Sequence, residues 1–246
     1  MKGIALAAAV VAAALALSNT NAWADTSALD FEGYAAGTIH LQDGWSSSGA
    51  AGSGCAVYDH AVVVNTGAPA SFGTQSLRMS NAVTSGCFSD QTFSKSLVDE
   101  AGETSAVSGG LSGGVRQPTF EAQWDFASTV PGAEQPGLSV GPSPDRGAGA
   151  RMSWVQMTDT PSGIEVNFYD FQAALNTGCN VGNGFVFTTV ATGLDRSVPH
   201  TVKLHMQFVD GPANDIVKVY VDGVLMHTGT SWEDYFRDCE GNPTRT

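Results

Sequence analysis

The sequence predicts an all-β protein in which two antiparallel sheets pack as a β-sandwich. The 246 residues include 29 glycines and 10 prolines, which separate short apolar runs, and no long segment shows helical periodicity. Several of these runs alternate apolar and polar residues, as strands do when one side of a sheet is buried and the other meets water. A chain of this length is compatible with one large all-β unit.

The first 24 residues are typical of a secretory signal peptide. One lysine precedes an apolar run from Gly3 to Leu17, and an A-x-A cleavage site ends at Ala24. This run is shorter than the roughly 20 apolar residues that cross a bilayer. We therefore expect residues 1–24 to be removed and residues 25–246 to form one secreted domain without a membrane span.

The charge balance restricts the partners of the protein. The formal net charge is −13, and no run of lysine or arginine occurs. Nucleic acid and anionic lipid are poor partners for such a chain, because both require a basic surface. An acidic surface also keeps a secreted protein soluble.

The predicted mature chain contains four cysteines: Cys55, Cys87, Cys179 and Cys239. An even number of cysteines in an exported chain suggests two disulfides. Three connectivities are open, and we favour Cys55 with Cys87 and Cys179 with Cys239, because each pair lies within one half of the chain. Each bond would contribute about 3 to 4 kcal/mol. No two cysteines have the short spacing of zinc ligands.

The clearest strands lie in the middle and C-terminal parts of the chain. Residues 119–128, 200–210 and 215–223 each contain a run in which apolar and polar residues alternate. The dipeptide Asp222-Gly223, between two apolar runs, is a strong hairpin signal, so residues 200–228 are predicted to form a three-strand meander. Weaker strands are predicted at residues 28–33, 61–65, 76–80, 137–141, 150–158, 164–172 and 184–191.

The segment HTVKLHMQF followed by KVYVDGVLMHTG resembles the concanavalin A-like lectin/glucanase superfamily, in particular its laminin G-like jelly rolls. The opening ALDFEGYAAGTIHLQDGW is similar to the first strand and loop of secreted bacterial members. The resemblance implies a two-sheet jelly roll whose concave polar sheet meets carbohydrate in many relatives. Such sandwiches usually finish on a strand, whereas this chain ends in the polar, turn-like RDCEGNPTRT. We therefore expect the chain to lack its last strand.

Two enzymatic interpretations follow from the resemblance. Laminarinase-like hydrolases place three carboxylates, E-x-D-x-E, on one strand face, and Glu121, Gln123 and Asp125 occupy similar positions here. Gln123 cannot ionise, whereas a retaining glycosidase needs two carboxyl groups about 5 to 5.5 Å apart. Jelly-roll polysaccharide lyases combine residue types that Gln123, Arg151, His205 and Tyr169 supply, but no lyase motif surrounds them. We expect a non-catalytic protein, with an extracellular glycoside hydrolase or polysaccharide lyase as the alternative.

A lectin-like protein that binds extracellular polysaccharide is therefore the favoured interpretation. Tyr169 and Tyr220 occupy the polar phases of their strands, where an aromatic ring has no core to fill. Trp232, in TSWEDYF, either adds a stacking platform or, as we favour, forms a short helical cap with Ser231 as its N-cap. The candidate carbohydrate-binding residues are Tyr169, Tyr220, Trp232, Glu121, Gln123 and Asp125.

One loop also offers oxygen ligands for a metal. Asp210, Asn214 and Asp215 lie within six residues, and calcium prefers carboxylate and amide oxygens. The same residue types dominate turns for backbone reasons alone, and the EF-hand pattern is absent. We favour an ordinary turn and keep calcium as the alternative.

Overall fold

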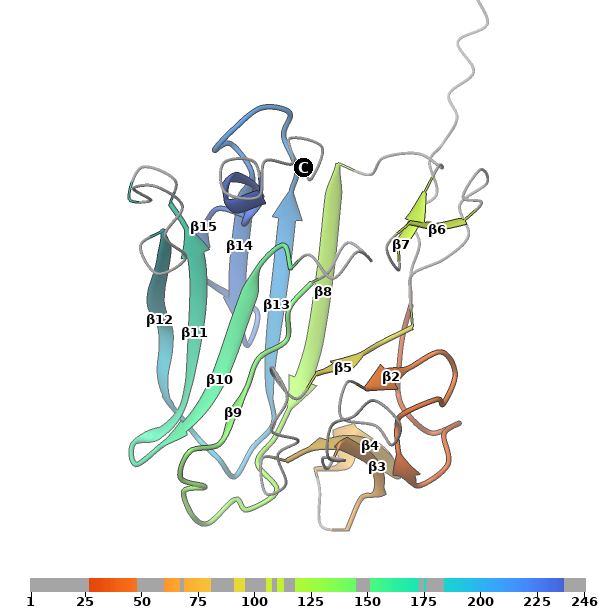
Figure 1. The fold of residues 1–246 in the computed structure, drawn as a ribbon. Helices are drawn as coiled ribbons and strands as arrows, with labels where there is room; N and C mark the ends of the chain where they lie inside the picture. The colour runs from red at the N-terminus through yellow and green to blue at the C-terminus, as the bar shows by residue number, and fades with distance from the viewer. Residues whose placement is uncertain are drawn as a thin grey trace, which may run out of the picture.

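The computed structural model describes residues 27–47, 60–66, 69–80, 91–95, 105–107, 110–112, 118–144, 151–172, 175 and 184–236. Within these ranges the chain is almost entirely antiparallel β-structure (Figure 1), which confirms the all-β prediction. None of its helices is long and apolar enough to cross a membrane, as far as the described residues show. The predicted signal peptide, the four cysteines Cys55, Cys87, Cys179 and Cys239, and the C-terminal residues 237–246 lie outside the described residues.

Two four-stranded antiparallel sheets make up the C-terminal part of the chain. The first sheet has the strand order β12 (Phe185–Leu194), β11 (Gly163–Phe171), β10 (Trp154–Thr160) and β9 (Ser139–Val140). The second has the order β15 (Val224–Gly229), β14 (Ile216–Val221), β13 (His200–Gln207) and β8 (Thr119–Phe126). The predicted meander is present as β13, β14 and β15.

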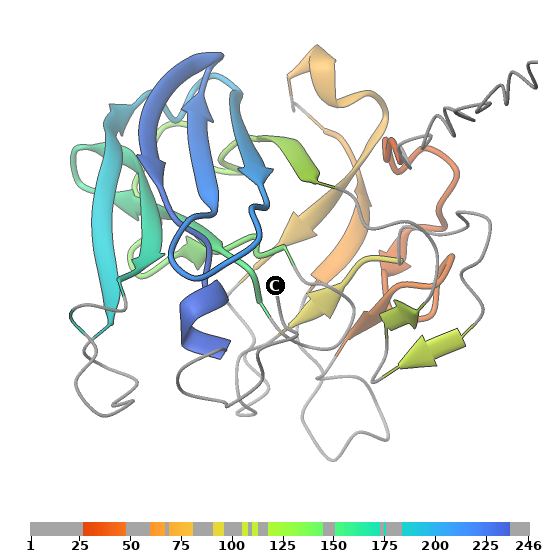
Figure 2. The same cartoon turned by 90° about the horizontal axis from the view of Figure 1, so that it is seen from above.

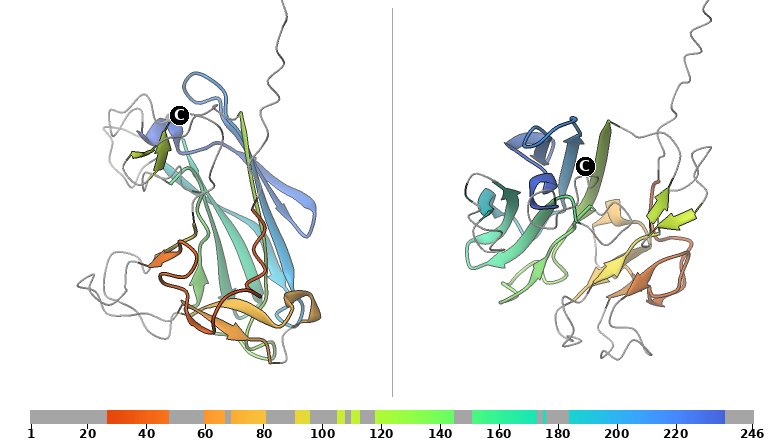
Figure 3. Two further views of the ribbon diagram at one scale, coloured as in Figure 1. Left: turned by 90° about the vertical axis from the view of Figure 1, so that its right-hand side faces the viewer. Right: turned by 45° about the horizontal axis from the view of Figure 1, so that its top comes forward.

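One hydrophobic core joins these two sheets. Alternate residues of β10 and β11, such as Val155 and Phe168, are fully buried in the same cluster as Leu204 of β13 and Val219 of β14. The left view of Figure 3 shows the two sheets as neighbouring layers. Burying a side chain of this kind contributes roughly 1.5 to 3 kcal/mol. As the alternation in the sequence predicted, the apolar side chains of both sheets are buried together in one core.

The hairpin between β14 and β15 turns at the predicted dipeptide. Asp222 has φ 49° and Gly223 has φ 78°, and positive φ at both central residues defines a type I′ turn. The Asp222 N–H donates to the carbonyl of Thr201 on β13 at 2.8 Å. The turn is thus held against the neighbouring strand, and it lies beside the polar side of the sheet.

The N-terminal part of the chain forms smaller sheets. These are β1 (Gly37–Thr38), β3 (His60–Val64) and β4 (Gln75–Met79); β2 (Ser46–Ser47) with β5 (Thr92–Phe93); and β6 (Ser105–Val107) with β7 (Gly110–Ser112). A 3-10 helix, η1 (Ala70–Phe72), precedes β4. Seen from above, β1 to β5 lie beside the two larger sheets (Figure 2). Their core is separate, with Ile39, Trp45 and Val62 at its centre.

The strand predicted at residues 28–33 does not form. Residues 31–34 adopt turns and bends instead, and Phe31 has φ 62°. The Asp30 carboxylate accepts a hydrogen bond from the Glu32 N–H at 3.1 Å, a local bond that competes with strand pairing. The prediction was wrong because the polar side chains of this segment, although exposed, bind backbone groups instead of alternating along a paired strand.

Candidate functional site

The outward face of the sheet β15-β14-β13-β8 gathers the polar residues that alternation predicted. Glu121, Gln123 and Asp125 are exposed on β8, whereas Phe120 and Trp124 pack against the core. Strand register then aligns these residues with outward residues of β13 and β14. The resulting rows are Gln123–Lys203–Tyr220, Glu121–His205–Lys218 and Asp125–Thr201, the last extended by Asp222 at the turn.

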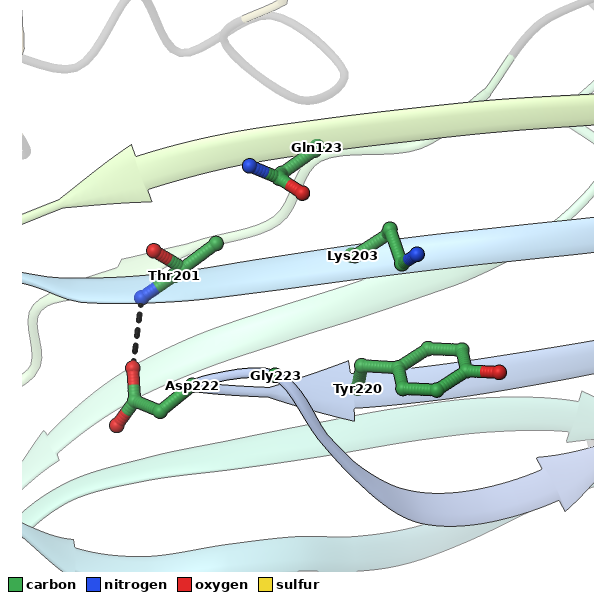
Figure 4. Close-up of a pocket in the computed structure, with 6 residues that line it drawn as sticks. All are labelled: Gln123, Thr201, Lys203, Tyr220, Asp222 and Gly223. Carbon is green, nitrogen blue, oxygen red and sulfur yellow. Dashed lines mark hydrogen bonds between the residues drawn. The ribbon is translucent and has the colours of Figure 1, made fainter.

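A hollow of about 470 Å³ opens on this face. Its lining residues belong to β8, β13, β14 and the β14–β15 turn (Figure 4). The hollow is open to water and lined mainly by polar groups, unlike the enclosed apolar pockets that bind most small molecules. The lining residues are Gln123, Thr201, Lys203, Tyr220, Asp222 and Gly223.

Lys203 carries the central charge of the hollow. Its Nζ lies 4.7 Å from the centre of the Tyr220 ring and 3.4 Å from Oε2 of Glu121. The same Glu121 oxygen lies 3.3 Å from Nδ1 of His205. The side chains of Lys203 and Glu121 are 30% and 51% exposed, and ion pairs this accessible contribute at most about 1 kcal/mol. A ligand can therefore displace them at little cost.

Thr201 holds two carboxylates at the other end of the hollow. Its hydroxyl donates to Oδ1 of Asp125 at 2.6 Å, and its backbone N–H donates to Oδ1 of Asp222 at 2.9 Å. Oδ2 of Asp222 lies 2.8 Å from Nδ1 of the buried His200. Partial burial opposes the ionisation of Asp222, but the hydrogen bonds from Thr201 and His200 outweigh it and lower the pKa of this carboxyl. An ionised carboxylate is suited to accept hydroxyl protons from a ligand.

Tyr169 lies on the other sheet, on the outward side of β11. Its ring stacks on Trp154 of β10, with centroids 5.0 Å apart and an interplanar angle of 21°, and meets Phe187 of β12 edge-on at 5.2 Å. The Tyr169 hydroxyl donates to Oε1 of Gln156 at 3.1 Å, and burial raises the pKa of this phenol. Tyr169 and Tyr220 therefore belong to outward faces of different sheets, and the six candidate residues do not form one surface.

The aromatic neighbours of Tyr169 were not among the predicted site residues. Trp154 and Phe187 stand in register with it on the two adjacent strands, and Phe187 is 51% exposed. Each occupies the outward phase of its own strand, which is a signal that the sequence contains. Their alignment in one row depends on strand pairing, which a single sequence does not reveal.

Trp232 is 8% exposed and belongs to a second buried cluster, with Phe171 and Phe236, against which Trp154 and Tyr169 pack. Its ring packs edge-on against Phe185 at 4.7 Å, and its indole N–H donates to the carbonyl of Tyr169 at 2.9 Å. The Ser231 hydroxyl accepts from the Glu233 N–H at 3.1 Å, as an N-cap does, at the start of the helical turn 233–236. This placement corresponds to the cap that the sequence favoured, and it leaves the ring little surface for a sugar.

The candidate calcium ligands take part in a connected loop. Oδ1 of the buried Asp215 accepts from the Val209 N–H at 2.9 Å, and its Oδ2 accepts from the Ser231 hydroxyl. The Asn214 amide donates to the carbonyl of Asp210 at 2.6 Å. The described part of the chain contains no group of three or more His, Cys, Asp or Glu that could hold a metal ion. Calcium binding by Asp210, Asn214 and Asp215 stays a prediction.

The lyase-type residues are divided between the two sheets. Gln123 and His205 lie on the polar face of β8 and β13, whereas the Arg151 guanidinium lies over the ring of Trp154 at 5.3 Å, near Tyr169.

Comparisons with family models, with curated proteins and with solved structures find no match to this chain.

Proposed function

We propose that the chain is a secreted, non-catalytic β-sandwich of the jelly-roll type seen in concanavalin A-like proteins, and that it binds extracellular polysaccharide. Two features support this fold assignment: two four-stranded antiparallel sheets enclose one core, and the VYVDGVL segment forms the hairpin β14–β15. The binding surface is the outward face of the sheet β15-β14-β13-β8.

The observation that carries the proposal is the chemistry of the 470 Å³ hollow. The hollow is lined by the amide of Gln123, the hydroxyl of Thr201, the carboxylate of Asp222, the ammonium of Lys203 and the phenol ring of Tyr220 (Figure 4). Sugars offer hydroxyls that both donate and accept, together with apolar C–H faces that stack on aromatic rings. The hollow supplies a partner for each of these features.

The arrangement of carboxylates favours binding over catalysis. Gln123, which lies between Glu121 and Asp125 on the same exposed face of β8, cannot ionise, so the strand lacks the middle carboxylate of the laminarinase-like pattern. The Asp125 carboxylate already accepts a hydrogen bond from the Thr201 hydroxyl. The lowered pKa of Asp222 suits a permanent hydrogen-bond acceptor rather than a general acid.

The test compares two tyrosines on opposite faces. Tyr220→Ala should weaken retention on the polysaccharide that binds the wild type by about tenfold or more, as expected for an aromatic ring at the centre of a site. Tyr169→Ala is the matched control and should leave retention unchanged. The reverse result would move the site to the other sheet, and release of reducing ends or unsaturated products would replace binding by hydrolysis or elimination.

A further inference from the structure

Positive charge is scarce in this chain, and part of it is concentrated on the polar face. The chain contains four lysines against a net charge of −13. Two of them, Lys203 and Lys218, lie on the adjacent strands β13 and β14 and share the outward phase with His205, which pairs with Lys218. Every other outward residue of these two strands is uncharged. The centre of the face is therefore cationic.

The acidic groups of the face lie at its margins. Glu121 and Asp125 belong to the edge strand β8, and Asp222 belongs to the turn. Asp125 and Asp222 already accept hydrogen bonds from Thr201, and Asp222 also contacts His200. Glu121 is the carboxylate that faces the cations, and it contacts both Lys203 and His205.

The two lysines are available to a ligand. The contact between Lys203 and Glu121 is 3.4 Å long and open to water, so an incoming anion can take the place of Glu121 without leaving a buried charge behind. Within the described part of the chain, Lys218 has no ion-pair partner. Each ammonium can thus gain a partner on binding.

From this arrangement we infer that the polysaccharide bound on this face carries anionic groups on its sugar rings. Lys203 and Lys218 bind these groups, and Tyr220 packs against a ring between them. The inference rests on the proposed function and adds the chemical class of its ligand. The shared chemistry is a fixed negative charge on the sugar, supplied by a carboxylate or by a sulfate.

The negative net charge of the protein does not oppose this selection at short range. At physiological ionic strength, charges separated by more than about 8 Å are largely screened. The net charge slows the approach of a polyanion at low salt, whereas the groups within the face determine the affinity once contact is made. Binding should weaken when salt is raised well above 0.15 M, because the bound ammonium groups exchange with counterions.

The experiment uses pairs of polymers that differ in charge alone. Polygalacturonate is compared with its methyl ester, and dextran sulfate with dextran, by calorimetry or biolayer interferometry with the intact exported chain. We expect at least one charged member to bind about tenfold more tightly than its neutral partner, and the pair that responds distinguishes carboxylate from sulfate. Equal affinity within both pairs overturns the inference.

The variants separate a local effect from a change of net charge. Lys203→Gln and Lys218→Gln should each weaken binding of the charged polymer by roughly two- to fivefold, in line with exposed charge pairs. Lys95→Gln is the matched control, since Lys95 pairs with Asp43 in the N-terminal part of the chain, and it should have no effect. An equal loss in Lys95→Gln would show that net charge alone acts and would overturn the inference.

Glu121→Gln should change the affinity for the charged polymer in the opposite direction. Removing the carboxylate that competes for Lys203 and His205 should strengthen binding of the charged polymer severalfold and leave neutral polymers unaffected. Weaker binding of the charged polymer would contradict the inference.

If the protein instead binds a neutral polysaccharide and loses it in Tyr220→Ala, the anionic class is wrong while the proposed function stands. Failure to retain any polysaccharide defeats the proposed function itself.

Discussion

The described parts of residues 27–95 and of residues 118–236 differ in the size of their hydrophobic cores and in the length of their strands. In the second region, twelve buried apolar side chains from two sheets form one core, and most of its strands have six or more residues. In the first region the described core has three such side chains, Ile39, Trp45 and Val62, and its strands have two to five residues. Short strands bury little apolar area, so the N-terminal region needs another source of stability.

Polar side chains in this region bind the backbone across loops. The Gln42 amide donates to the carbonyls of Ala35 and Thr38 at 3.0 and 2.7 Å, and its oxygen accepts from the Ala35 N–H at 2.8 Å. The Glu32 carboxylate accepts from the N–H groups of Thr74 and Gln75, more than 40 residues away. The C-terminal region is therefore specified mainly by a repeated pattern of apolar residues, whereas the N-terminal region depends more on individual polar contacts.

Truncating one large side chain in each core should show whether the two regions unfold separately, and it has the largest expected effect. Leu204→Ala should cost about 2 to 5 kcal/mol and speed amide hydrogen exchange throughout β10 to β14, because Leu204 is fully buried between the two sheets. Ile39→Ala removes a similar volume from the other cluster. It should speed exchange in β3 and β4 and leave β13 and β14 protected. Equal loss of protection in both regions after Ile39→Ala would mean that the two cores unfold as one unit.

The same difference between the two regions explains which parts of the fold could be predicted from the sequence. Alternation identified β8, β13 and β14, and it placed Glu121, Gln123 and Asp125 on an outward face. It could not show that β8 pairs with β13, which brings Glu121 beside His205 from 84 positions away. The roles of Lys203 and Thr201 appeared only with that pairing.

The N-terminal region was predicted only in part. The strands expected at residues 61–65 and 76–80 form as β3 and β4, whereas the strand expected at residues 28–33 does not form. The segment ALDFEG has the residue types of a strand, yet the Glu32 side chain binds backbone groups near residue 74. No local pattern encodes a contact over that distance. Where the structure of a region depends on single polar contacts between residues far apart in the chain, local sequence patterns cannot predict it.

A glycine in the N-terminal region tests this dependence on individual contacts. Gly73 has φ 65°, and an added Cβ would lie 2.2 Å from Oε1 of Glu32. Gly73→Ala should therefore strain the backbone and displace the Glu32 carboxylate, at a cost of about 1 to 3 kcal/mol to the N-terminal region. Hydrogen exchange of β3 and β4 is the measurement. Gly33→Ala is the control, because a Cβ there meets nothing within 4 Å, and it should be neutral; equal effects of the two variants would contradict the argument.

Asp222→Asn gives the smallest expected effect and probes a polar contact within the C-terminal region. Asparagine keeps the left-handed turn before glycine but removes the charge that contacts His200 and Thr201. Since the Asp222 side chain is 47% exposed, solvent screening limits the loss to about 1 kcal/mol or less at pH 7. Thermal unfolding followed by circular dichroism measures it. Asp125→Asn changes the net charge equally, leaves the turn intact and serves as the control.

The difference in stability between the wild type and Asp222→Asn should depend on pH in a definite direction. Partial burial raises the pKa of Asp222, but the hydrogen bonds from Thr201 and His200 prevail and lower it below its ordinary value. A carboxyl group with a lowered folded-state pKa stabilises the fold fully above its unfolded pKa of about 3.9 and loses that contribution as pH falls through the folded value. The wild type and Asp222→Asn should differ most above pH 5 and converge near pH 2. A difference that persists unchanged at pH 2 would show that the asparagine disturbs the turn itself and that the charge is not what stabilises it.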